Sequence, residues 1–165
     1  QYRGELASVP GFKWGTLWKS PVEPNSYLLM SMYESEAAAH LGLERIIDDG
    51  LLLLATERME QPAEAYSVQV EKMAGKFESS DDLGQYLSIS DRVAQPGFGS
   101  ELVRSVNESL TDDVLNEGYV GHIIGSVVGL NDRVFGLVFW RDVVAYNASR
   151  PAIMPFELKF FERVA

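Results

Sequence analysis

The chain has 165 residues, of which 46% are apolar, and its three Trp, seven Tyr and eight Phe supply enough bulk for a hydrophobic core, which excludes a disordered polypeptide. A formal net charge of −10, with the 14 Lys and Arg scattered along the sequence, excludes a nucleic-acid partner. The longest apolar run, 51–55, is far shorter than the roughly 20 residues of a membrane-spanning helix, and the absence of cysteine excludes disulfides and thiolate chemistry. We expect a soluble, cytoplasmic protein with no membrane partner.

The first half of the chain alternates β-branched and aromatic runs with turn residues, a pattern typical of short strands. The predicted elements are a strand over 12–19, a turn over 20–25, a strand over 27–33, a helix from Ser35 and a strand over 66–71. The residues between the helix start and the last strand include 41–61, which we expect to extend the helical region over the sheet, with Gly50 as a break. A polar, glycine-bounded segment, 75–84, is predicted to be a linker.

The second half is predicted to have the order β-α-β-β-α-β. Its predicted elements are a strand over 86–93, a turn over 95–97, a helix with an apolar stripe from Leu102 to Leu115 that ends near Gly118, a strand over 119–128, a hairpin turn over 129–133, a strand over 134–140, a short helix over 142–149 and a strand from Phe156.

The two halves also match each other at a constant offset of 107 residues. Gly11-Phe12 corresponds to Gly118-Tyr119, and Tyr33-Glu34-Ser35 corresponds to Trp140-Arg141-Asp142. The last strands differ by an offset of about 90, so the first copy carries about 17 extra residues within 41–61. At the offset of 107, the first strand of the first copy would lie about 21 residues before Gln1. We expect an N-terminal extension or a partner strand to supply it.

These features resemble the antibiotic biosynthesis monooxygenase-like proteins of the dimeric α+β barrel superfamily. The similarity rests on the Gly-aromatic strand start, the hairpin that ends in an aromatic and a polar pair, and the stretch from Arg92 to Gly97 before a helix. It implies an α+β fold in which two ferredoxin-like repeats, 1–74 without its first strand and 85–165, form an intramolecular dimeric α+β barrel. Single-domain members pair as homodimers, and whether this chain also forms a homo-oligomer stays open.

The resemblance implies several activities. Members include cofactor-independent monooxygenases that oxidise polycyclic phenols to quinones, and haem-degrading enzymes with an Asn on the first strand, a Trp at the end of the third and a His about ten residues later. Trp140 matches that Trp, but Arg150 stands at the position of the His and the strand over 86–93 has no Asn. Haem degradation is therefore disfavoured. We expect oxidation of a small aromatic or polyketide-like molecule by O₂ without a cofactor.

Three residues are candidate catalytic groups. His122 and His40 have ordinary pKa values near neutrality and are the candidate bases, although lone histidines are often surface or hydrogen-bonded core residues. Trp140 lies at a strand end, where its N–H is expected to hold a substrate anion. Neither His belongs to a set of residues with the spacing of metal ligands, so no metal site is predicted.

The candidate substrate-binding residues are aromatic, cationic or amide-bearing, and comprise Tyr33, Trp140, Tyr146, Asn147, Arg92 and Arg150. A planar aromatic substrate would stack on the rings, and a guanidinium would stabilise a phenolate or enolate. The alternative for each is core packing or a surface ion pair. The rival hypothesis for the whole chain is a non-catalytic small-molecule-binding or assembly protein with the same fold, in which Trp14, Trp18 and Trp140 only fill the core.

Overall fold

The computed structural model describes residues 6–50, 64–110, 116–149, 156 and 158–164. The elements are β1 (Phe12–Lys19), β2 (Tyr27–Tyr33), α2 (Glu36–Asp48), β3 (Val68–Ala74), η1 (Ser80–Leu83), β4 (Tyr86–Val93), α4 (Gly99–Ser109), β5 (Tyr119–Val127), β6 (Leu130–Trp140), α5 (Val143–Ser149) and β7 (Leu158–Arg163). They form two compact units, one made of 1–16 with 29–65 and the other of 17–28 with 66–165. The protein is a mixed α+β fold, as predicted.

Every predicted strand is confirmed, three of them with the predicted bounds. The hairpin between β5 and β6 is tighter than predicted, because Val127 pairs with Leu130 and leaves a turn of only two residues. Gly129 adopts φ +81°, which glycine tolerates without steric cost, so the two strands extend to the turn itself. The helical extension predicted over 41–61 is described only to Gly50, and the end of the apolar stripe beyond Leu110 lies outside the described residues.

The strands have the order β2-β1-β7-β4-β6-β5-β3. Within this order, β7-β4-β6-β5 is the arrangement of a complete ferredoxin-like β-α-β-β-α-β unit, with all of its pairs antiparallel. The two outer pairings join strands of different halves of the sequence, since β1 pairs with β7 and β3 with β5. In each case the last strand of one half lies beside the Gly-aromatic strand of the other.

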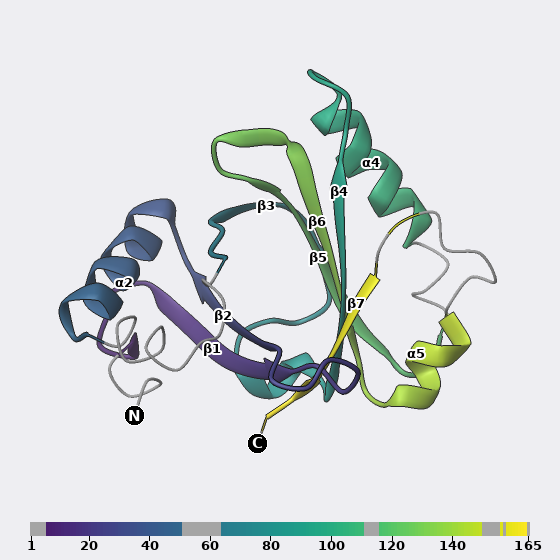
Figure 1. The fold of residues 1–165 in the computed structure, drawn as a ribbon, viewed down its shortest axis with the longest axis horizontal. Coiled ribbons are helices and arrows are strands. Elements are labelled where there is room, and N and C mark those ends of the chain that lie inside the picture. Colours follow the sequence, from purple (N-terminus) through teal and green to yellow (C-terminus); the bar gives the residue numbers. More distant parts are fainter. Residues whose placement is uncertain (1–5, 51–63, 111–115, 150–155, 157, 165) are drawn as a thin grey trace. The chain divides into compact units, whose positions relative to one another are not determined.

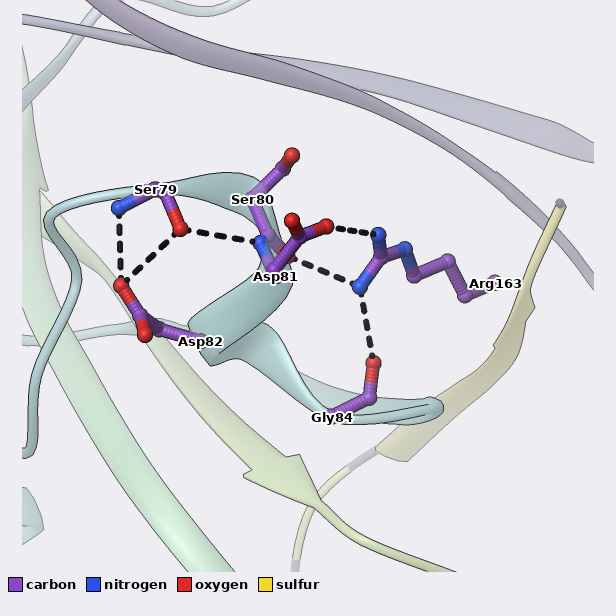
Figure 2. A network of polar contacts seen from close by, with 6 residues as sticks. All are labelled: Ser79, Ser80, Asp81, Asp82, Gly84 and Arg163. Carbon is purple, nitrogen blue, oxygen red and sulfur yellow. Dashed lines mark hydrogen bonds and ion pairs between the residues drawn. The ribbon is translucent and has the colours of Figure 1, made fainter.

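The segment predicted as a linker, 75–84, is anchored to the unit that contains β4 to β7. Its Phe77 and Leu83 are buried, and Ser79 caps η1 through a reciprocal pair of hydrogen bonds with Asp82. The Arg163 side chain on β7 reaches the same turn, where it donates to the carbonyl oxygens of Ser80 (2.8 Å) and Gly84 (3.4 Å) (Figure 2). The turn is therefore held by both packing and hydrogen bonds.

The sheet of the second unit has two chemically different faces. Figure 1 shows α4 and α5 on one side of β4 to β7. On that helix-facing side, Val103 and Val106 of α4 pack on Ile124 and Val134. The opposite face holds a separate aromatic cluster, in which Phe139 lies 5.1 Å from Phe77 and 6.1 Å from Trp18 between ring centres, together with buried Leu87 and Phe161. Trp14, Thr16 and Trp18 are all buried, as expected for alternate residues of one strand face.

β4 shows the difference between the two faces most clearly. Its residues alternate between sides, so Leu87 and Ile89 face away from the helices and Ser88, Ser90 and Arg92 face toward them. A buried strand face is usually apolar, whereas here it carries two buried hydroxyls and a guanidinium. The helix-facing side of β4 is therefore a row of polar groups within an otherwise apolar layer.

Hydrogen bonds recur at the offset predicted from the sequence. The backbone N–H of Glu34 donates to the carbonyl oxygen of Gly11 at 2.8 Å, and that of Arg141 donates to Gly118 at the same distance. A Cβ on either glycine would crowd an alanine, Ala38 in the first half and Ala145 in the second, which also differ by 107 positions. Two local contacts of the same kind therefore occur at positions 107 residues apart.

The caps of α2 and α5 correspond in the same way. The Ser35 side chain accepts a hydrogen bond from the N–H of Ala38 (3.2 Å), and the Asp142 side chain accepts one from the N–H of Ala145 (2.9 Å). Each satisfies a backbone donor of the first helical turn that has no partner within its helix. Two different residue types perform the same function at equivalent positions.

Removing either cap should destabilise the protein by a similar amount. We expect Ser35→Ala and Asp142→Ala each to lower the free energy of unfolding by about 1 kcal/mol, because each leaves one N–H of the first turn unpaired. Urea denaturation would measure both. Ser35→Asp should retain stability, and an Asp142→Ala variant as stable as the wild type would show that the cap contributes nothing to α5.

Candidate functional site

The helix-facing side of the second unit carries a tyrosine-histidine pair on β5. The Tyr119 hydroxyl oxygen lies 2.7 Å from Nδ1 of His122. Residues three apart on a regular strand point to opposite faces, but the register of β5 against β6 shifts between Tyr119 and Gly121. This irregularity places both side chains on one face, a recognised effect of β-bulges.

The other ring nitrogen of His122 has no hydrogen-bond partner. His122 is 3% exposed, and its Nε2 is a buried polar atom with no partner in the structure. If the Tyr119 hydroxyl donates to Nδ1, Nε2 carries a proton and is a free donor; if Nδ1–H donates to the hydroxyl oxygen, Nε2 presents a free lone pair. In either tautomer the atom has an unused hydrogen-bonding capacity, and leaving it unpaired costs stability.

Burial lowers the pKa of His122 below its ordinary value, because removal from water disfavours the charged imidazolium. The ring is therefore neutral at pH 7, the form that can accept a proton. In the tautomer whose Nδ1–H donates to the Tyr119 hydroxyl, the unprotonated Nε2 has the form that a general base needs.

The lowered pKa predicts how stability depends on pH. Because the folded-state pKa lies below the unfolded value of about 6.5, the unfolded state binds more protons in the interval between them, and stability falls as the pH drops through that interval. Above the unfolded pKa the contribution is fully present. Urea denaturation across pH 4 to 8 should show this loss in the wild type and a smaller loss in His122→Gln. His40→Gln should show the same loss of stability as the wild type, since the His40 side chain is 71% exposed. If stability fell equally with pH in the wild type and in His122→Gln, the pH dependence could not be assigned to His122.

Trp140 forms the next part of the site. It is 2% exposed, and its indole N–H donates to the Ser88 hydroxyl at 3.0 Å. Its ring makes edge contacts with Tyr119 (6.1 Å) and Tyr146 (6.3 Å). The N–H that the sequence suggested for holding a substrate anion is thus already used within the fold, and what Trp140 offers is its ring.

Further aromatic rings continue from Trp140 along the sheet. Tyr146 stacks on Phe160 with 4.0 Å between ring centres, and Phe160 lies parallel to Tyr86 at 5.5 Å. These rings come from α5, β7 and β4, so helix and sheet both contribute to the aromatic layer. Aromatic rings of this kind stack favourably on flat aromatic molecules.

Arg92 lies at the far end of the polar row on β4. Its guanidinium lies 3.6 Å from the centre of the Phe156 ring, its Nε is buried without a hydrogen-bond partner, and burial lowers its pKa. Arg92 pairs with Val134 and His122 with Val138, four residues further along β6, which corresponds to roughly 13 Å. The two groups therefore cannot contact one substrate oxygen together.

The remaining predicted site residues are distributed differently. Asn147 is exposed on α5, and Arg150 lies outside the described residues. His40 and Tyr33 belong to the other compact unit. His40 is exposed on α2, 3.3 Å from Glu44, and the Tyr33 ring packs over Gly42 with its hydroxyl buried and unpartnered. The structure brings together His122, Trp140 and Tyr146. Sequence reasoning did not single out Tyr119, because only the irregular strand turns it toward His122.

Among the described residues, no group of three His, Cys, Asp or Glu side chains is arranged to hold a metal ion. No helix in that part of the chain is long and apolar enough to cross a membrane. A surface hollow of about 430 Å³ is lined by Lys19, Ser20, Pro21, Pro24, Glu162, Arg163 and Val164, none of which is a predicted site residue. Its Arg163 guanidinium is already occupied by the turn at Ser80 (Figure 2).

Comparison with solved structures identifies the fold. A proposed monooxygenase from Fusobacterium nucleatum superposes over 99% of this chain and 82% of its own, with a TM-score of 0.75 and 11% sequence identity. A ferredoxin-fold protein related to antibiotic biosynthesis monooxygenases, from Listeria monocytogenes, covers 92% of this chain and 80% of its own at a TM-score of 0.55 and 9% identity. The chain has the antibiotic biosynthesis monooxygenase-like fold.

An anthrone oxidase-like protein has the same monooxygenase-like fold, with a TM-score of 0.70 and 13% identity over 98% of this chain and 81% of its own. No family model matches the sequence, and no curated protein is similar to it. The resemblance inferred from the residues is therefore confirmed at the level of the monooxygenase-like α+β fold. At these identities the fold does not determine the chemistry, which has to be argued from the site.

Proposed function

We propose that this protein binds a small, flat phenolic molecule on the helix-facing side of its second unit and oxidises it with O₂, without a prosthetic group. The observation that carries the proposal is the buried, unpartnered Nε2 of His122, whose ring is held by Tyr119. The rings of Trp140 and Tyr146 supply the aromatic surroundings that such a substrate prefers.

In the proposed reaction the substrate reacts as its phenol tautomer, in which one hydrogen of the ring CH₂ of the keto form has moved to the carbonyl oxygen and left a ring CH. The neutral His122, in the tautomer whose Nε2 is unprotonated, accepts that phenolic proton and leaves an anion delocalised onto the ring CH, with the Tyr119 hydroxyl stabilising the imidazolium through its hydrogen bond. The anion transfers one electron to O₂, and the resulting radical pair combines to form a C–O bond. The peroxide takes the proton back from His122. Loss of the remaining C–H proton then cleaves the O–O bond and gives a quinone carbonyl and water.

In the overall reaction a ring CH₂ of the keto form and O₂ become a ring C=O and H₂O, so the substrate supplies all four electrons that oxygen accepts. No metal or flavin is required for the electron transfer. The protein has to hold the substrate, remove one proton and keep the resulting anion in an apolar layer. Because water does not solvate the anion there, the anion gives up an electron to O₂ more readily.

Arg92 is assigned a binding role at a distance from the reacting oxygen. Its guanidinium, whose Nε is buried, would donate hydrogen bonds to a carboxylate or carbonyl at the far end of a polycyclic substrate that lies along the polar row of β4. Arg92 and His122 are offset by roughly 13 Å along the strand direction and lie on the strands either side of β6, an arrangement that suits a molecule of several fused rings rather than a single phenol.

The matching contacts at the offset of 107 support a further part of the proposal, namely that the halves 1–74 and 85–165, joined through 75–84, are copies that form an intramolecular dimeric α+β barrel. The exchanged pairings of β1 with β7 and of β3 with β5 are reciprocal, as expected for two copies related by a pseudo-twofold axis.

Oxygen uptake with dihydroxyanthrone, a tricyclic phenol related to the name of one structural neighbour, tests the function. The proposal predicts saturable uptake of one O₂ per quinone formed, above the rate without protein. Saturable binding of dihydroxyanthrone without oxygen uptake would indicate a binding or carrier protein and would contradict the proposed oxidation.

A further inference from the structure

The two halves of the chain differ at the positions that carry the chemistry. At the offset of 107, Tyr119 corresponds to Phe12 and His122 corresponds to Gly15. The correspondence is structural as well, because Phe12 contacts the Tyr33 ring edge-on at 5.6 Å, as Tyr119 contacts Trp140 at 6.1 Å. The same backbone arrangement therefore carries a polar pair in one half and none in the other.

The position of the Phe12 ring supports this comparison. A Cβ built on Gly15 would lie 3.4 Å from the end of the Phe12 ring, so that ring lies over Gly15 much as Tyr119 lies beside His122. Phe12 has no hydroxyl, and Gly15 has no side chain. The first half thus has the shape of the pair without a proton donor or acceptor.

The counterpart of Trp140 is also used differently. Tyr33 packs so closely over Gly42 that a Cβ at that glycine would overlap its ring and hydroxyl. The missing side chain on α2 is what makes room for it. The corresponding position in the second half is Ser149, which has a side chain of its own and donates to the carbonyl oxygen of Tyr146. In the first half the aromatic ring fills the layer between helix and strand.

We propose that each chain has a single phenol-binding site, in the second half, and that the first half is a structural copy which has lost the groups needed to bind and deprotonate a phenol. This inference rests on the proposed function and adds the number and place of the sites. It predicts that one ligand molecule binds per chain, whereas two equivalent halves would bind two.

Binding stoichiometry tests the inference. Dihydroxyanthraquinone, which resembles the product and consumes no oxygen, is titrated into the full chain at a protein concentration well above the dissociation constant, with Trp fluorescence and calorimetry as readouts. We expect saturation at one probe per chain. His122→Gln and Tyr119→Phe, the second of which gives β5 the residue type that β1 carries at Phe12, should each weaken binding at least tenfold.

Gly15→Ala is the matched control at the position equivalent to His122. The added Cβ meets only ordinary van der Waals contacts, so the fold and the probe affinity should stay within twofold of the wild type. Two probes per chain, or a loss of affinity in Gly15→Ala equal to that in His122→Gln, would overturn the single-site inference while leaving the proposed function in place. An absence of saturable binding by the wild type would instead contradict the proposed function itself. Circular dichroism of each variant separates misfolding from a lost contact.

Discussion

His122→Gln should lower the rate of oxygen uptake with dihydroxyanthrone by about 10²- to 10⁴-fold, the usual loss when a general base is removed. Glutamine keeps the length and hydrogen-bonding capacity of the side chain, so it preserves the contact with Tyr119 while removing the proton acceptor. The rate is measured with an oxygen electrode at saturating substrate. Because burial lowers the pKa of His122, we also expect the wild-type rate to fall only as the pH drops through this lowered pKa, which lies below the ordinary value of about 6.5.

Two controls sharpen this prediction. His40→Gln alters the other histidine, which is exposed beside Glu44, and should leave the rate within twofold of the wild type. Raising the pH increases the fraction of substrate that is already ionised, so the deficit of His122→Gln should shrink at high pH. A rate unchanged in His122→Gln at pH 7 would exclude His122 as the base.

Trp140→Ala should destabilise the protein by about 3–5 kcal/mol, the range for removing a fully buried large aromatic side chain. It deletes the edge contacts with Tyr119 and Tyr146 and leaves the Ser88 hydroxyl without its donor. Urea denaturation measures the change. The loss is large against the 5–15 kcal/mol that a typical domain has in total, so a fraction of the variant should be unfolded at 37 °C.

Milder substitutions separate packing from binding at this position. Ser88→Ala removes only the acceptor of the indole N–H and should cost about 1–3 kcal/mol. Trp140→Phe keeps most of the ring volume, and in the proposed function it should weaken dihydroxyanthraquinone binding more than it weakens folding. If Trp140→Phe changed stability alone, Trp140 would be a core residue with no part in the site.

Much of the fold could be predicted from the sequence, because the strands have strong β-branched and aromatic patterns. The bounds of β1, β2 and β4 follow from those patterns. The hairpin at Gly129 was predicted too long, since composition marks a turn region without showing which two residues make it. The polar row on β4 is visible in the alternation of Ser88, Ser90 and Arg92, but only the packing of α4 and α5 shows which face it occupies.

The candidate site could be predicted only in part. His122 and Trp140 were identified as residue types suited to the chemistry, and the register of β5 against β6 brings them to one side of the sheet. The contact between Tyr119 and His122 depends on an irregularity in β5, which the sequence pattern does not predict. The sequence predicts that the indole N–H of Trp140 faces a substrate. In the structure this N–H donates instead to the hydroxyl of Ser88, a buried residue on the neighbouring strand β4. Pairings of this kind depend on register, which strand patterns leave undetermined.

A crystal structure of the protein with bound dihydroxyanthraquinone would show where a phenolic molecule binds. We expect one molecule against the rings of Trp140 and Tyr146, with a phenolic oxygen at hydrogen-bond distance, about 2.6–3.2 Å, from Nε2 of His122. A ligand bound in the hollow beside Lys19 and Arg163, or bound away from His122 in any other place, would contradict it.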